Sequence, residues 1–262
     1  MFAENETAIA RHESRGPTTA SAGSASFSEE LESNVAAAVD RPKESVDSEP
    51  ASTCPDDLVY LALSNKVETA VRDRMAYRLH RRWANKHHVV REWPVTGDST
   101  SKRRIDFGVT LGGCQCKDVS HVLALTHAFE LKSFYSYDIE FGHKCGLFAN
   151  LAAAVRTIRH PEMAKSLHME ARRFALLTVT HLQCDPEATA VHLLAKSYRR
   201  GVRKLCPEVW DANRFDPTHR YKEASRHEGL GEPQLVCARY CSSIEPIHGA
   251  TVSLGYWLYR HD

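Results

Sequence analysis

The segment from residue 103 to residue 111 constrains the fold more than any other part of this 262-residue chain. Apolar and polar side chains alternate along it, and the apolar set is Ile105, Phe107, Val109 and Leu111. Because residues two apart in a strand share a face, this alternation predicts a strand with one buried face. Residues 89–95 and 122–135 also have strand-like patterns, so we expect three consecutive strands that form an antiparallel meander.

Helical periodicity surrounds these strands. A helix is expected over residues 57–86, opened by Asp56 or Asp57, with one apolar stripe that comprises Val67, Val71, Met75, Leu79 and Trp83. A second helix over 147–158 leads to a strand over 173–181, and a third helix follows over 188–205. A strand reached across a helix adds in parallel, so the predicted fold class is α/β, a mixed β-sheet flanked by helices.

Composition divides the chain into three parts. Residues 1–55 hold four basic and ten acidic side chains and few large apolar ones, which predicts a disordered acidic leader. Residues 56–207 form the predicted α/β core. Residues 208–262 form a C-terminal extension, whose segments 235–241 and 251–260 are expected to pair as a β-hairpin packed on the core.

Two carboxylates and a lysine fall on the predicted strands. Glu130 and Lys132 are two residues apart, so they share a face, and Asp106 lies on the polar face of its own strand. If these strands pair, the three side chains meet. Close carboxylates repel each other unless a cation lies between them, and such oxygen ligands suit Mg²⁺ or Mn²⁺. A neighbouring lysine can orient a water molecule and stabilise phosphate charge, so the pattern favours metal-assisted phosphodiester hydrolysis.

A third carboxylate has two candidates. Glu68 lies on the first predicted helix, at the edge of its apolar stripe, and a helix packed on the sheet would direct it to the same metal. Glu92, on the first predicted strand, is the competing choice. We expect Glu68 to point toward the sheet, and Glu92 to take its place if Glu68 points to solvent.

These residues resemble the PD-(D/E)xK nuclease superfamily. The resemblance rests on Arg104-Ile105-Asp106-Phe107, a 23-residue interval after Asp106, and Glu130-Leu131-Lys132. It covers residues 57–182 and departs from the motif at Ile105, where the family commonly has Pro. It implies a restriction-endonuclease-like core of order αβββαβ and Mg²⁺-dependent cleavage of DNA. It also implies that Asp106, Glu130 and Glu68 bind the metal and that Lys132 is the catalytic lysine.

The implied partner is a nucleic acid, most simply DNA, and basic side chains near the predicted site are expected to bind its phosphates. Arg104 belongs to a basic cluster before the second strand, and His143 and Lys144 follow the third strand. The residues outside the leader carry 30 basic and 23 acidic side chains, which is consistent with a polyanionic partner. A homodimer would suit double-strand cleavage. The alternatives are an inactive nuclease-like module that binds DNA or protein, and an unrelated α/β domain.

Cysteine and histidine residues leave a zinc site open as a further alternative. The first ligand group would be Cys114, Cys116, His121 and His127, and the second Cys237, Cys241 and His248. Their spacing fits no standard zinc pattern, and buried reduced cysteines are the competing interpretation. No apolar run reaches the length of a membrane span, and the first residues do not resemble a secretory signal, so we expect a cytoplasmic protein with no membrane partner.

Overall fold

A computed structural model describes most of the chain after the predicted leader. The described residues are 56–64, 67–83, 87–94, 104–111, 125–142, 146–160, 167–243 and 245–261. The predicted leader lies outside them, as do residues 112–124. Within the described residues, no helix is long and apolar enough to cross a membrane.

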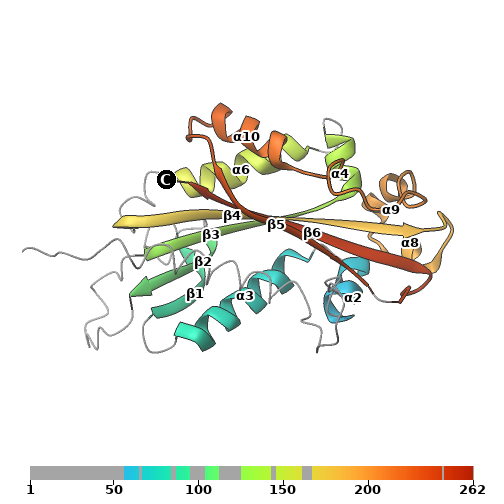
Figure 1. Ribbon diagram of the computed structural model, residues 1–262, viewed down its shortest axis with the longest axis horizontal. Coiled ribbons are helices and arrows are strands. Elements are labelled where there is room, and N and C mark those ends of the chain that lie inside the picture. Colours follow the sequence, from blue (N-terminus) through green and yellow to red (C-terminus); the bar gives the residue numbers. More distant parts are fainter. Residues whose placement is uncertain are drawn as a thin grey trace, which may run out of the picture.

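A six-stranded mixed sheet forms the centre of the molecule (Figure 1). Its strands are β1 (His87–Pro94), β2 (Arg104–Leu111), β3 (Leu125–Tyr135), β4 (Leu167–Cys184), β5 (Gln234–Ser242) and β6 (Ala250–His261). They lie in the order β1-β2-β3-β4-β6-β5, and only the pair of β3 and β4 is parallel. The predicted fold class, a mixed sheet flanked by helices, is confirmed.

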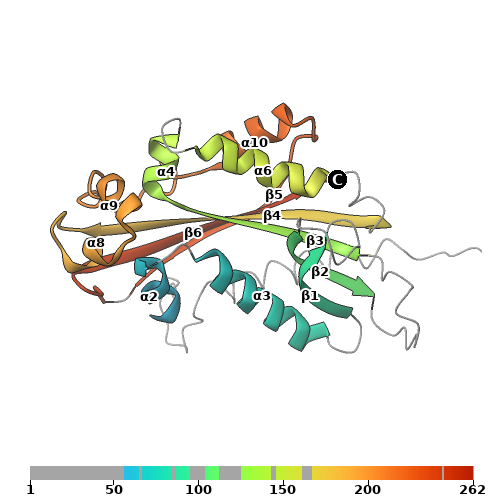
Figure 2. The same cartoon turned by 180° about the vertical axis from the view of Figure 1, so that it is seen from behind.

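Helices cover both faces of this sheet, as the two opposite views in Figures 1 and 2 show. One face carries α2 (Asp56–Ser64) and α3 (Glu68–Trp83), and the other carries α6 (Leu147–Arg159) and α10 (Thr218–His227). Three short helices complete the described part: α4 (Ser136–Glu140), α8 (Thr189–Leu193) and α9 (Lys196–Val202). The predicted stripe of α3 is buried against the sheet, and α6 buries Leu151 and Val155 on the opposite face.

The helix predicted over 57–86 is two helices. α2 ends at Ser64 and α3 begins at Glu68, so the apolar stripe from Val71 to Trp83 belongs to the second helix alone. The helix predicted over 188–205 is also divided, because Leu194 and Ala195 have extended backbone between α8 and α9. α10 was not predicted, since its ten residues are mostly polar.

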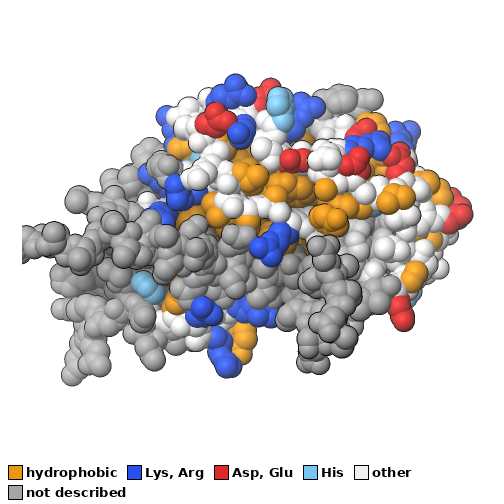
Figure 3. All heavy atoms as spheres, viewed as in Figure 1, with side chains coloured by type: hydrophobic (Ala, Val, Ile, Leu, Met, Phe, Trp, Pro, Cys, Tyr) orange, Lys and Arg blue, Asp and Glu red, His pale blue; other side chains and the backbone are white. Residues whose placement is uncertain are grey.

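The C-terminal strands pair with each other as predicted, and they also continue the main sheet. β6 pairs with β4 from Ala250 to His261, which places β5 at the sheet edge. Figure 3 shows hydrophobic side chains exposed over β5, and Leu235 and Tyr240 are among the exposed ones. The extension is therefore an integral part of the sheet and not a separate hairpin laid against the core.

The pairing of β2 with β3 ends inside the sheet, and this ending positions the polar cluster described below. Phe107 pairs with Phe129, and their rings stack with centroids 4.3 Å apart. No pair follows toward Asp106 and Glu130, although β3 continues beside β4 to Tyr135. From Glu130 onward, the backbone of β3 therefore has no paired residue of β2 on that edge.

Candidate active site

Asp106 stands at the point where the two strands part. Its Oδ2 accepts a hydrogen bond of 2.6 Å from the backbone N–H of Leu131, so the carboxylate replaces the strand pairing that ends one residue earlier. The side chain is 13% exposed. Burial raises the pKa of Asp106, and the Leu131 hydrogen bond and the charge of Lys132 oppose that rise.

Glu130 is the most deeply buried carboxylate of the cluster, with 7% of its side chain exposed. Its Oε1 accepts a hydrogen bond of 2.8 Å from Lys132 Nζ. Its Oε2 is buried and has no hydrogen-bond partner among the described residues. Burial raises the pKa of Glu130 to about 8, in spite of the neighbouring ammonium. A buried carboxylate with a free oxygen is costly for the fold alone.

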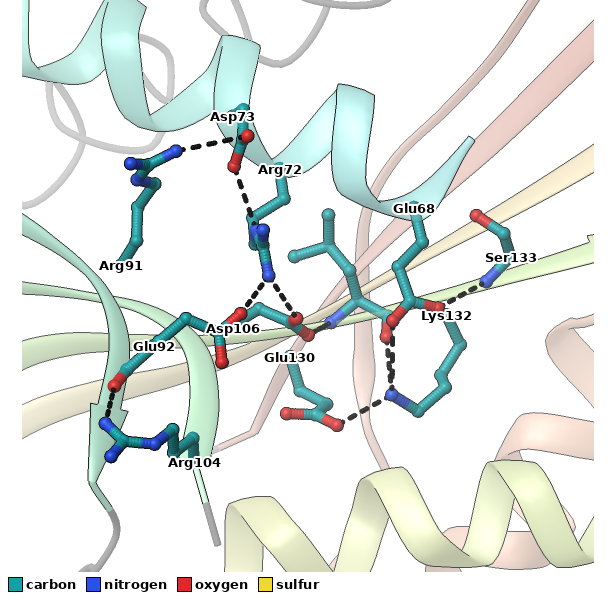
Figure 4. A network of polar contacts seen from close by, with 11 residues as sticks. Glu68, Arg72, Asp73, Arg91, Glu92, Arg104, Asp106, Glu130, Lys132 and Ser133 are labelled. Atoms are coloured by element: carbon teal, nitrogen blue, oxygen red, sulfur yellow. Dashed lines mark hydrogen bonds and ion pairs between the residues drawn. The ribbon is translucent and has the colours of Figure 1, made fainter. Parts of the chain in front are cut away.

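Lys132 connects the carboxylates (Figure 4). Its Nζ lies 2.8 Å from Glu130 Oε1, 2.8 Å from the carbonyl oxygen of Leu131 and 3.7 Å from Glu68 Oε1. Burial alone would lower the pKa of Lys132, but the carboxylates of Glu130, Glu68 and Asp106 raise it. The ammonium is therefore held charged in the middle of the cluster.

Glu68 reaches the same cluster from the other side of the sheet. It is the first residue of α3, and its Oε2 accepts a hydrogen bond of 3.2 Å from the backbone N–H of Ser133. This contact is possible because β2 no longer covers that edge of β3. The side chain points toward β3 and not to open solvent, with 32% of it exposed.

Glu92 and Arg72 form an adjoining group. Arg72 lies one turn after Glu68 on α3, and its guanidinium contacts the Glu92 carboxylate and lies 3.8 Å from Asp106 Oδ1. Glu92 is about half exposed and does not contact Lys132 or Glu130 in any described interaction. Sequence reasoning missed Arg72 among the several arginines of its helix. The usable signal was its i+4 spacing from Glu68, which puts both side chains on one flank.

Of the predicted nucleic-acid-binding residues, the structure describes only Arg104, and it is not part of this cluster. Arg104 is exposed and donates a hydrogen bond of 2.9 Å to the backbone carbonyl of Glu92, whereas His143 and Lys144 lie outside the described residues. Over the described ranges, no three His, Cys, Asp or Glu side chains have an arrangement that could hold a metal ion. Lys132 Nζ contacts both Glu68 and Glu130, at 3.7 Å and 2.8 Å.

The zinc alternative gains no support from the described cysteine and histidine residues. Cys237 is not part of a disulfide bond, whereas Cys241 is, so Cys241 is not available as a thiolate ligand. Burial lowers the pKa of His127 to about 3. Cys114, Cys116 and His121 lie outside the described residues.

Comparison with known proteins found no relative of this chain. No family model matches the chain, and no curated protein or solved structure matches it. The resemblance to the PD-(D/E)xK superfamily stays a prediction, based on the motif residues. Function is therefore inferred from the chemistry of the cluster itself.

Proposed function

We propose that this protein is a metal-dependent nuclease that hydrolyses phosphodiester bonds in DNA. The observation that carries the proposal is the convergence of Glu68, Asp106, Glu130 and Lys132 where β2 leaves β3. These residues come from one helix and two strands and are far apart in the sequence. A cluster of three carboxylates with one lysine supports cation-assisted phosphate chemistry better than it supports the fold.

The donor set suits a divalent cation. Glu130 Oε2 is buried without a hydrogen-bond partner among the described residues, and Asp106 Oδ1 faces only the Arg72 guanidinium, at 3.8 Å. Both are hard oxygen donors of the kind that Mg²⁺ and Mn²⁺ prefer. We assign Asp106 and Glu130 as the primary ligands and Glu68 as the third acid. The bound cation would polarise the phosphate and make a bound water more acidic.

Lys132 supplies a positive charge and hydrogen-bond donors, which the carboxylates lack. Its ammonium is anchored by Glu130 and by the Leu131 carbonyl, which fixes its position within the cluster. From there it can orient the attacking water by hydrogen bonding and balance the charge that develops on the phosphate oxygens. We therefore assign Lys132 as the catalytic lysine.

DNA is the proposed substrate because unpaired cations lie on the helix that carries Glu68. Arg78 and Arg81 are exposed on α3 and make no ion pair with any residue of the described part. Figure 3 shows basic side chains gathered at the lower edge of the molecule, where α3 lies in Figure 1. Cations of this kind bind a phosphate backbone without reading its sequence. A homodimer remains part of the proposal for double-strand cleavage.

Plasmid cleavage by the purified chain tests the proposal. We expect nicking in Mg²⁺ or Mn²⁺, none in EDTA, and a loss of at least about a hundredfold in Asp106→Asn and Glu130→Gln. Glu140→Gln is the matched control, since Glu140 pairs with Arg214 outside the cluster. Cleavage that persists in EDTA, or full activity in Asp106→Asn, contradicts the mechanism.

A catalytically inactive nucleic-acid-binding module is the second candidate. It is favoured by one observation: Lys132 and Arg72 already neutralise the carboxylates without a metal. In this case the protein retains DNA in Mg²⁺ but cleaves none of it, and Glu130→Gln leaves retention unchanged.

A further inference from the structure

Arg72 is held at the cluster by more carboxylates than a structural ion pair needs. Its Nε donates a hydrogen bond of 3.0 Å to Asp73, its neighbour on α3. One of its terminal nitrogens contacts Glu92 and lies 3.8 Å from Asp106 Oδ1. Its side chain is only 15% exposed, so the guanidinium is enclosed by the carboxylates that it contacts.

The contact with Asp106 competes with the proposed metal. Asp106 Oδ2 accepts a hydrogen bond from the backbone N–H of Leu131, so Oδ1 is the oxygen more open to a cation. That oxygen faces Arg72. A divalent ion on Oδ1 and a guanidinium on the same oxygen would repel each other strongly at such a distance, so both cannot hold it at once.

The partner of Arg72 on β1 is under backbone strain. Glu92 has a φ of 53°, a left-handed conformation that is unfavourable for residues with a side chain. Two arginines hold it there, because Arg104 donates to its carbonyl oxygen while Arg72 contacts its carboxylate. Glu92 is also about half exposed. It therefore gives Arg72 a carboxylate partner at the more exposed side of the cluster, and this partner does not depend on Asp106.

We propose that Arg72 is a phosphate-binding residue of this site, which Asp106 and Glu92 hold as an internal counter-ion until a divalent cation takes Asp106. This inference rests on the proposed function. Metal binding removes one carboxylate from Arg72, and the freed planar guanidinium then donates to a nonbridging oxygen of the DNA phosphate beside the metal. The same residue thus opposes metal binding and supports substrate binding.

The two effects have opposite signs, which gives a sharp test. Arg72→Gln is compared with wild type and with Arg78→Gln, a control on the same helix whose arginine contacts no carboxylate among the described residues. Mn²⁺ affinity is measured by calorimetry without DNA. DNA affinity is measured with Ca²⁺ as the cation. We expect Arg72→Gln to bind Mn²⁺ about tenfold more tightly and DNA about tenfold more weakly. Arg78→Gln should leave Mn²⁺ affinity unchanged.

Three other results would contradict the inference. A structural role for Arg72 predicts that both affinities fall together in Arg72→Gln, and that result overturns the inference. Unchanged Mn²⁺ affinity in Arg72→Gln, with normal binding by wild type, overturns it while leaving the proposed function intact. If wild type binds no Mn²⁺ and Glu130→Gln changes nothing, both the proposed function and the inference fail. Thermal unfolding in EDTA checks that Arg72→Gln is folded.

Discussion

Two buried polar clusters involve β3, and they differ in how fully their hydrogen bonds are satisfied. Where β3 ends, Ser136 Oγ lies 2.8 Å from His181 Nδ1, and His181 Nε2 lies 2.7 Å from the carbonyl oxygen of Glu208. Both ring nitrogens of that histidine have partners, and burial lowers its pKa, which keeps it neutral. Where β2 leaves β3, the cluster is charged, and Glu130 Oε2 has no partner among the described residues.

This difference supports the proposal that the Glu130 cluster serves a function, whereas the His181 cluster supports the fold. Buried polar groups that only support a fold are almost always hydrogen-bonded, because an unsatisfied one costs about 1–3 kcal/mol. The hydroxyl of Ser136 and both ring nitrogens of His181 follow that rule. The Glu130 cluster departs from it and gathers three carboxylates around one lysine. A fold accepts such a cost at sites that bind something, so substitutions in the two clusters should have opposite consequences for activity and stability.

The largest expected effect is at Lys132. Lys132→Ala should lower the rate of plasmid cleavage by about a hundredfold to a thousandfold, because a positioned donor that stabilises charge in the transition state contributes on that scale. Metal affinity should not fall, since the ammonium is not a ligand. Lys132→Arg should restore little activity, because the planar guanidinium does not reproduce a compact ammonium.

Lys222→Ala provides the comparison for this variant. Lys222 pairs with Glu232 on the exposed side of α10, so its removal should leave cleavage unchanged. Equal activity of Lys132→Ala and Lys222→Ala would remove Lys132 from the mechanism.

The next effect is on stability and belongs to the structural cluster. His181→Ala leaves Ser136 unpaired and opens a cavity beside Trp210 and Phe215, whose rings pack on the imidazole. The free energy of unfolding should fall by about 2–4 kcal/mol. Urea denaturation measures it, with His192→Ala on α8 as an exposed control expected to change it by less than about 0.5 kcal/mol. Cleavage per folded molecule should stay normal in His181→Ala, and a selective loss of cleavage would mean that the two clusters are not separate in function.

Local patterns predicted the strands and the apolar stripe of α3. They also assigned the proposed site residues to the strands and the helix on which the structure places them. Asp106, Glu130 and Lys132 follow from alternation within single strands, which is a local property. Local patterns did not predict the division of the helix over 188–205. Its backbone is extended at Leu194, a buried residue with no Pro or Gly beside it to signal the break. α10 buries chiefly Tyr221, Ala224 and Ser225, too few apolar residues for a recognisable stripe.

The details of the site depend on contacts between distant segments. Nothing in the sequence of β2 or β3 shows that their pairing stops at Phe107 and Phe129, yet this ending exposes the N–H groups of Leu131 and Ser133. Those two groups bind Asp106 and Glu68. The position of Arg72 depends in turn on the strained backbone of Glu92, which belongs to another strand. Register and strain are tertiary properties, so local periodicity cannot predict them.

A smaller effect should appear as a dependence of stability on pH. Glu130 has a pKa of about 8 in the folded chain and about 4.3 when unfolded. Between these values the folded state binds the additional proton, so the free energy of unfolding falls as pH rises, by at most about 1.4 kcal/mol per pH unit. Glu130→Gln cannot titrate and lacks this decline.

Denaturation of wild type and Glu130→Gln in EDTA, at several values between pH 5 and pH 8, measures the difference in slope. We expect the variant to gain stability relative to wild type as pH rises. Parallel pH curves for the two proteins would mean that Glu130 is ionised throughout this range. His181→Ala should not show this difference in slope, which keeps the two clusters distinct.

The smallest effect is expected at the hydroxyl pair beside the site. Ser133 Oγ and Thr178 Oγ1 lie 2.6 Å apart and are buried. Ser133→Ala or Thr178→Val alone leaves one hydroxyl unpaired and should cost about 1–2 kcal/mol, whereas the double variant removes both groups and should cost no more than one single variant. Cleavage should survive in all three, because Glu68 accepts its hydrogen bond from the backbone N–H of Ser133 and not from the hydroxyl. Urea denaturation of the four proteins gives the coupling energy. Strictly additive losses would show that the hydroxyls do not pair, and a loss of cleavage in Ser133→Ala alone would show that the site needs the serine side chain as well as its backbone.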